Sequence, residues 1–178
     1  METKVLIAGF GGQGVLSMGK MICEAAVQQG RNATFFPSYG GEQRGGTCNC
    51  MVVLSDDSIG SPIVTKGNYV IIMNNPSYEK FKDNVLPGGI LLLNTSQVQR
   101  ELSKGSELLG IEADRLAEQA GGRIAANMVM LGAFTNVSKF ASQQEMEQML
   151  RTALSKKPQY LQTNLTAFHL GIESVSHG

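Results

Sequence analysis

The chain has 178 residues, 42% of them hydrophobic and 17% charged, and its fifteen basic side chains balance fifteen acidic ones. This is the composition of one globular domain, without the basic excess of a nucleic-acid binder or the run of about 18 apolar residues that a membrane span needs. The first residues show no secretory signal, and Cys23, Cys48 and Cys50 are spaced for neither a disulfide framework nor a zinc site, so we expect a reduced, cytoplasmic protein.

The first fifty residues give the clearest pattern. Lys4–Phe10 is a nearly continuous apolar run, typical of a parallel strand covered on both faces. A glycine-rich turn follows, and apolar positions at helical spacing predict a helix from Val15 to about Gln29. Ala33–Tyr39 is a second predicted strand. This order of strand, glycine turn, helix and strand opens a doubly wound fold.

The middle of the chain alternates further strands with turns. In Thr47–Ser55, alternation predicts a strand with Cys48, Cys50, Val52 and Leu54 on one face and Asn49, Met51 and Val53 on the other. The remaining predictions are strands at Tyr69–Met73, Ile90–Leu93 and Leu108–Ile111, a helix from Asn74-Asn75-Pro76 to about Val85, and a turn at Pro87-Gly88-Gly89.

The last third is predicted to be helical, beginning with a helix at Ala113–Ala120. Ile124–Val137 is apolar nearly all round and predicts a buried helix. Ser142–Ser155 carries one apolar stripe, and the segment after Pro158 carries another through Leu161, Leu165, Phe168, Ile172 and Val175. We therefore expect a single Rossmann-like α/β domain over residues 1–178, with a mostly parallel sheet flanked by helices.

The first candidate site is the turn Gly9-Phe10-Gly11-Gly12-Gln13-Gly14, which matches G-x-G-x-x-G between a strand and a helix. Such a turn lets a ligand approach the backbone and presents helix N–H groups to an anion. Dinucleotide binding also calls for an acidic residue at the end of the second strand, where this chain has Thr34-Phe35-Phe36-Pro37. That absence argues against binding of NAD or NADP. Two roles for the turn then remain: it faces an anion or a partner protein, or it is purely structural.

The second candidate site is the glycine-rich stretch Ser38-Tyr39-Gly40-Gly41-Glu42-Gln43-Arg44-Gly45-Gly46. It leaves the carboxyl end of the second strand, so we expect it to lie near Gly11–Gly14. A solvated loop holding a Glu–Arg ion pair is the alternative reading. So many glycines are entropically costly unless the backbone needs special dihedral angles or close approach.

These two motifs carry a resemblance. The run GFGGQGV…SYGGEQRGGTCNCMVVLSD…IGSP, with the later NLTAFHLG, resembles the γ subunit of the 2-oxoacid:ferredoxin (or flavodoxin) oxidoreductases over nearly the whole chain. The resemblance implies a non-redox subunit that provides scaffold and access for coenzyme A. By the same resemblance, Gly11, Gly12, Gln13 and Gly14 form the turn. Tyr39, Glu42 and Arg44 then belong to a loop facing the partner subunits or coenzyme A, whose charge Arg44 could meet.

The resemblance also implies which groups the whole complex uses. The α and β subunits would hold thiamine diphosphate with Mg and a [4Fe-4S] cluster, a ferredoxin-like δ subunit would accompany them, and ferredoxin or flavodoxin would accept the electrons. This chain alone would bind no cofactor. The short chain is nearest the 2-oxoglutarate branch, with branched-chain and aryl-pyruvate enzymes close behind. In isolation, its uncovered apolar surface could pair two copies as a homodimer.

The residues themselves offer no catalytic or metal-binding set. The cysteines lack cluster spacing, and the two histidines, His169 and His177, lie near the end of the sequence, His169 beside Phe168 on a predicted helix. This lack of a catalytic set is what we expect of a subunit that assists catalysis by its partners. A free-standing dinucleotide-binding Rossmann protein and an assembly protein without a ligand remain the alternatives.

Overall fold

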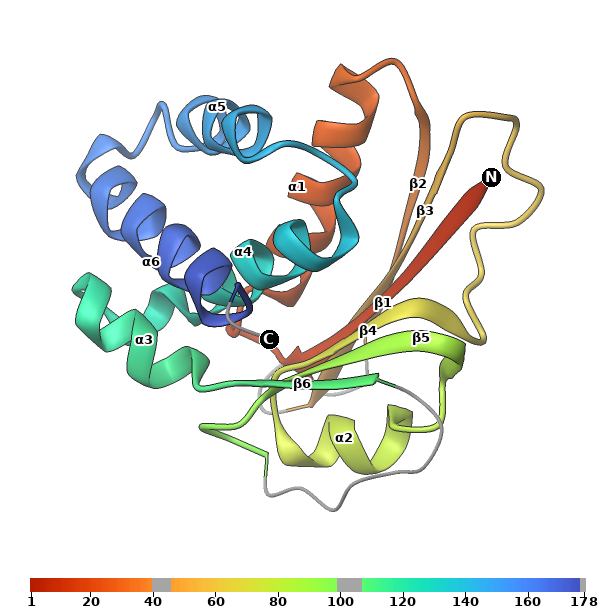
Figure 1. Ribbon diagram of the computed structural model, residues 1–178, viewed down its shortest axis with the longest axis horizontal. Helices are drawn as coiled ribbons and strands as arrows, with labels where there is room; N and C mark the ends of the chain where they lie inside the picture. The colour runs from red at the N-terminus through yellow and green to blue at the C-terminus, as the bar shows by residue number, and fades with distance from the viewer. Residues whose placement is uncertain (40–45, 99–106, 177–178) are drawn as a thin grey trace.

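A computed structural model describes residues 1–39, 46–98 and 107–176. Its strands form one six-stranded sheet in the order β2-β3-β1-β4-β5-β6 (Figure 1). Their bounds are β1 Glu2–Phe10, β2 Asn32–Tyr39, β3 Thr47–Ser55, β4 Gly67–Ile72, β5 Val85–Asn94 and β6 Glu107–Ile111. The helices are α1 Val15–Gln28, α2 Asn75–Phe81, α3 Ala113–Ala120, α4 Ala126–Ser138, α5 Gln143–Ala153 and α6 Leu161–Ser174, with short 3-10 helices η1 Arg123–Ala125 and η2 Pro158–Tyr160.

The sheet is mostly parallel. β1, β4, β5 and β6 pair in parallel, whereas β3 pairs antiparallel with both β1 and β2. Among the described strands, β3 therefore runs against all the others. β2 points the same way as β1 but does not touch it, because β3 lies between them. The sequence pattern predicted these strands without revealing that the third would insert beside the first.

Helices cover both faces of the sheet. Figure 1 shows α1, α4, α5 and α6 on one side and α2 on the other. Because successive strand residues point to opposite faces, Val5 and Ile7 enter the larger apolar cluster, and Leu6 and Ala8 enter the smaller one beside α2. All four side chains are fully buried, as the continuous apolar run predicted. The predicted α/β class, with a helical last third, is confirmed.

Alternation in β3 also follows the prediction. Cys48, Cys50, Val52 and Leu54 belong to the larger cluster, whereas Val53 belongs to the smaller one. This pattern fixes the register against β1, where Ile7 pairs with Cys50. A slip by one residue would turn both sets of side chains to the wrong face.

Three predicted boundaries were wrong. α2 ends at Phe81 rather than near Val85. The predicted turn at Pro87-Gly88-Gly89 lies inside β5, where the pairing jumps from Gly67 with Val85 to Tyr69 with Ile90. The glycines thus form a bulge, and Gly88 has a φ of 75°. Ile124 lies before the buried helix α4 and is 83% exposed.

Two glycines allow α4 and α6 to cross in backbone contact. A Cβ on Gly132 would overlap the carbonyl oxygen of Phe168, and one on Gly171 would overlap the carbonyl oxygen of Val129. Each helix thus offers a glycine to the other helix's backbone. This crossing places Phe168 in the larger cluster with no exposed surface.

Candidate functional site

The carboxyl ends of four parallel strands meet at one edge of the sheet, and a cavity lies there. Its wall takes Gly12 and Gln13 from the segment after β1, Met73 after β4, Gln97 after β5 and Asp114 after β6. The volume is about 290 Å³, and η1 with the start of α4 completes the wall through Arg123, Ile124 and Ala126. Open α/β sheets place their ligands at this edge.

The glycine turn forms one wall of the cavity. Gly12 and Gly14 have φ angles of 92° and 74°, which L-residues with side chains rarely adopt. A Cβ on Gly12 would meet nothing within 4 Å, so its backbone borders open space. A Cβ on Gly14 would overlap the side chain of Asn127. Backbone conformation thus requires both glycines, and close packing additionally requires the second.

Gln13 anchors the turn to the neighbouring strand. Its Oε1 accepts a hydrogen bond from the backbone N–H of Phe10 at 2.7 Å and another from Nδ2 of Asn74 at 2.9 Å. Asn74 is also the N-cap of α2, where its Oδ1 accepts from the N–H of Ser77 at 2.9 Å. Gln13 therefore joins the ends of β1 and β4, besides lining the cavity.

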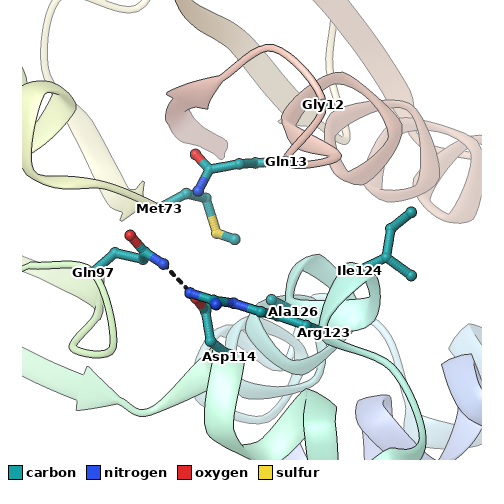
Figure 2. A pocket seen from close by; sticks show the side chains of 8 residues that line it. All are labelled: Gly12, Gln13, Met73, Gln97, Asp114, Arg123, Ile124 and Ala126. Atoms are coloured by element: carbon teal, nitrogen blue, oxygen red, sulfur yellow. Dashed lines mark hydrogen bonds and ion pairs between the residues drawn. The ribbon is translucent and has the colours of Figure 1, made fainter. Parts of the chain in front are cut away.

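An ion pair forms the opposite wall. Arg123 donates from Nε at 2.9 Å and from one terminal nitrogen at 2.7 Å, both to Oδ2 of Asp114. Gln97 donates to the same oxygen, and Asn94 Nδ2 donates to Oδ1 at 2.8 Å. Figure 2 shows Gln97, Asp114 and Arg123 gathered together, with Gln13 and Met73 across from them. The polar groups thus form one network rather than separate contacts.

Burial and hydrogen bonding have opposite effects on the pKa of Asp114. Burial alone would raise the pKa of its carboxyl group. Hydrogen bonds from Gln97, Asn94 and Arg123, together with the charge of Arg123, outweigh that effect and hold the pKa below its ordinary value. Asp114 is therefore a carboxylate at neutral pH, and its position in the first turn of α3 favours that charge further.

An apolar side completes the cavity. Met73 is 1% exposed, whereas Ile124 is 83% exposed at the rim. An exposed large side chain beside a polar network suits an organic ligand or a partner surface better than it suits a bare ion.

The structure brings together some of the predicted site residues. Gly12 and Gln13 line the cavity, and Gly11 and Gly14 belong to the same turn. The Gly11 N–H points to the carbonyl oxygen of Gly46 at 3.5 Å, so the end of the second glycine-rich stretch lies beside the turn.

The remaining predicted site residues are Tyr39, Glu42 and Arg44. Tyr39 ends β2 and pairs with Cys48 of β3, which separates it from β1 by a strand. Glu42 and Arg44 lie outside the described residues. Their predicted roles remain predictions.

The sequence interpretation missed Gln97, Asp114, Arg123 and Ile124. No motif joins them, because they come from three separate segments. One signal was available for Asp114, which lies three residues after a predicted strand and in the first turn of a predicted helix, the same strand-to-helix junction that marked the glycine turn.

Cys48 and Cys50 are buried, and Cys23 is half-buried. Burial raises the pKa of Cys50 to about 12, with a smaller effect from Cys48, and its thiol points to the carbonyl oxygen of Val15 at 3.5 Å. Burial also raises the pKa of Cys23 and Cys48.

Within the described ranges, no group of three His, Cys, Asp or Glu side chains is placed to hold a metal ion. His169 pairs with Glu147 at 2.8 Å on the surface formed by α5 and α6.

Strand order weakens the dinucleotide alternative. In dinucleotide-binding folds the acidic residue that reads the ribose ends the strand next to β1. Here the strand on that side of β1 is the antiparallel β3, which displaces the end of β2 by a further strand spacing of about 4.8 Å. Within its described part, β2 also carries no acidic residue.

The chain belongs to the Pyruvate ferredoxin/flavodoxin oxidoreductase family, whose pattern matches residues 4–174. Ketoisovalerate oxidoreductase subunit VorA of Methanothermobacter thermautotrophicus is 37% identical over 174 residues. That alignment covers 97% of this chain but 36% of the relative, so the chain spans about a third of the VorA proteins it matches. The 2-oxoglutarate synthase subunit KorC of Methanocaldococcus jannaschii is 32% identical, with 97% and 94% of the two chains covered.

Solved structures share this fold. The γ subunit of a keto/oxoacid ferredoxin oxidoreductase from Geobacter sulfurreducens superposes with a TM-score of 0.84 at 26% identity, covering 99% of both chains. The 2-oxoglutarate:ferredoxin oxidoreductase from Magnetococcus marinus superposes with a TM-score of 0.90 at 24% identity, over 31% of its chain. In the described part of this chain, no helix is both long and apolar enough to cross a membrane.

Proposed function

We propose that this chain is the γ subunit of a cytoplasmic 2-oxoacid:ferredoxin oxidoreductase complex. In that reaction the bond to the carboxylate breaks and releases CO₂. The remaining acyl carbon gives up two electrons to ferredoxin or flavodoxin and joins the sulfur of coenzyme A, whose thiol releases its proton. The observation that carries the proposal is the family match over residues 4–174, combined with near end-to-end alignment to KorC and to a solved γ subunit.

The chemistry belongs to the partner subunits in this proposal. The α and β subunits hold thiamine diphosphate with Mg and a [4Fe-4S] cluster, and a ferredoxin-like δ subunit passes on the electrons. Burial raises the pKa of Cys50 to about 12 and so disfavours the thiolate that cluster ligation requires, which supports a non-redox role for this chain. Residues 1–178 act as one γ-type domain.

The favoured substrate is 2-oxoglutarate. Four relatives that match this chain are named 2-oxoglutarate synthase subunit KorC, and the alignments cover 87% to 99% of their length. The VorA sequences, named for ketoisovalerate, are more similar in identity, but the alignments cover 36% of their length. A branched-chain 2-oxoacid is therefore the second candidate.

The glycine turn at Gly11–Gly14 faces the coenzyme A channel and the partner subunits in this proposal, together with Tyr39, Glu42 and Arg44. An uncapped helix start beside a cavity supports that role for the turn. Arg44→Ala should raise the KM for coenzyme A or weaken assembly. Wild-type kinetics in an intact complex would contradict the assignment of Arg44.

The proposal is tested by purifying the tagged chain with its partners from anaerobic lysate. Viologen reduction is then measured with a panel of 2-oxoacids and coenzyme A. Two or three co-purifying subunits with oxoacid-dependent reduction would support the proposal and identify the substrate. Recovery of the chain alone, as monomer or homodimer and without activity on any oxoacid, would contradict it.

A further inference from the structure

Arg123 is held in one orientation at the cavity wall. A guanidinium carries five N–H donors, and in Arg123 two of them bond to Oδ2 of Asp114. The other three have no bond within the described part of the chain, and the side chain is 60% exposed. The arginine therefore offers donors to the cavity while one edge of its plane is fixed.

Asp114 is itself fixed from behind. Its side chain is 10% exposed, and Asn94 and Gln97 bind its two oxygens from the sheet side. Asn94 in turn accepts from the N–H of Ala113 at 3.2 Å. Because this network holds the carboxylate, a ligand that binds Arg123 need not pay the full entropy of ordering a long side chain.

The wall opposite Arg123 also favours negative charge. The turn at Gly12 borders open space without a side chain, and Gly14, the N-cap of α1, makes no side-chain cap. The described first turn of α1 contains no acidic residue, so nothing there neutralises the positive end of the helix dipole. Two separate elements, a fixed arginine and a bare glycine turn, thus line the same cavity (Figure 2).

We infer that this cavity is a phosphate-binding subsite in which Arg123 donates to the phosphate oxygens and Asp114 is the positioning residue for Arg123. The planar fork suits an oxyanion, and the glycine turn suits a tetrahedral group that approaches the backbone closely. The apolar contribution of Met73 and Ile124 indicates that the phosphate belongs to an organic ligand. Coenzyme A is that ligand if the proposed function holds, and an adenine nucleotide is the other source of the same chemistry.

The test measures binding of sodium pyrophosphate, ADP and coenzyme A to the full chain by calorimetry. Arg123→Met is compared with Arg115→Met, since Arg115 lies on the neighbouring α3 and pairs with Glu112 at 3.0 Å, outside the cavity lining. We expect Arg123→Met to weaken binding about tenfold or more and Arg115→Met to leave it within about twofold. Arg123→Lys, which keeps the charge but loses the fork, should fall between them.

A second measurement uses the assembled complex. The KM for coenzyme A should rise in Arg123→Met while kcat stays close to wild type, because the subsite holds a remote group rather than the reacting atoms. Arg123→Gln, which retains hydrogen-bond donors toward Asp114, serves as the variant if Arg123→Met unfolds. Thermal melting of each variant separates lost binding from lost folding.

The outcomes separate the two proposals. Arg123-dependent binding of pyrophosphate or ADP by a chain without partners or oxoacid activity would keep the subsite and remove the proposed function. An active complex whose coenzyme A KM is unchanged in Arg123→Met would overturn the subsite alone. Absence of binding of all three ligands to the wild-type chain, together with that unchanged KM, would overturn it as well.

Discussion

The glycine turn after β1 and the crossing of α4 with α6 both depend on glycine, for opposite reasons. At Gly12 there is room for a side chain, but the φ of 92° disfavours one. At Gly132 and Gly171 the backbone is helical, but the carbonyl groups of the facing helix occupy the space of a Cβ. The first region uses glycine for conformation and the second for contact. Gly14 combines both requirements.

The largest effect is expected at the helix crossing. Gly132→Ala places a methyl group against the carbonyl of Phe168, and a backbone cannot move aside as a side chain can. We expect a loss of about 3 kcal/mol or more in the free energy of unfolding, measured with urea. Gly60→Ala is the control, since a Cβ there meets nothing within 4 Å. Similar stability of the two variants would show that the two helices can move apart with little loss in the free energy of unfolding.

Gly14 allows the two requirements to be separated. Gly14→Ala should cost about 2–3 kcal/mol, part from its φ of 74° and part from overlap with Asn127. In the double variant with Asn127→Ala the overlap with Nδ2 and Cγ disappears, the contact with the Cβ of residue 127 at 3.0 Å remains, and most of the cost is then the conformational part of about 1–2 kcal/mol. A double-mutant cycle in urea measures the difference. Strict additivity of the two changes would mean that contact plays no part at this position.

Asp114→Asn tests whether the stability that the Asp114 network contributes depends on pH, while the stability contributed by the crossing of α4 and α6 does not. At pH 7 the variant should lose about 1–2 kcal/mol, because an amide group would present a donor to Arg123 or Gln97. The wild-type carboxyl has a folded-state pKa below its unfolded value. Its contribution is therefore present above about pH 4 and is lost as the pH falls through the folded-state pKa.

The corresponding measurement is urea unfolding of the wild type and Asp114→Asn at several pH values between about 3 and 7. The difference between them should shrink toward the acid end. The difference between the wild type and Gly132→Ala should stay constant over that range, since no titrating group enters that contact. A constant difference for Asp114→Asn would show that its charge adds no stability.

The smallest effect on stability belongs to the open part of the turn. Gly12→Ala should cost about 1 kcal/mol for its backbone conformation. Gly11→Ala, whose Cβ would meet nothing within 4 Å and whose φ is not positive, should change stability by less than about 0.5 kcal/mol. Thermal melting measures both. Equal effects of the two variants would remove conformation as the reason for glycine at position 12.

Local patterns predicted most of the elements and little of their arrangement. The helix Ala113–Ala120 and the strand Thr47–Ser55 occur with the predicted bounds, because period and breakers are local signals. The insertion of β3 between β1 and β2 depends on pairing between distant segments. No local pattern distinguishes it from a strand at the edge of the sheet.

The sequence predicted one wall of the candidate site and not the wall opposite it. The motif identified Gly12 and Gln13 because its spacing is contained in six residues of sequence. Asp114 and Arg123 became visible only when the fold brought the ends of four strands together. The apolar sequence around Ile124 predicted that this side chain would be buried. It is exposed instead, because the helix that buries its neighbours begins at Ala126.

The crossing of α4 and α6 has a consequence for synthesis on the ribosome. The sheet and α4 are made before α6, so the side of α4 that packs on α6 stays uncovered until Phe168 and the rest of α6 have emerged. A nascent chain therefore exposes this apolar side of α4 from the synthesis of α4 until α6 is complete, which is the condition under which chaperones are engaged. Chains released before Leu161 should be recovered as aggregates or degraded, even though they contain the entire sheet.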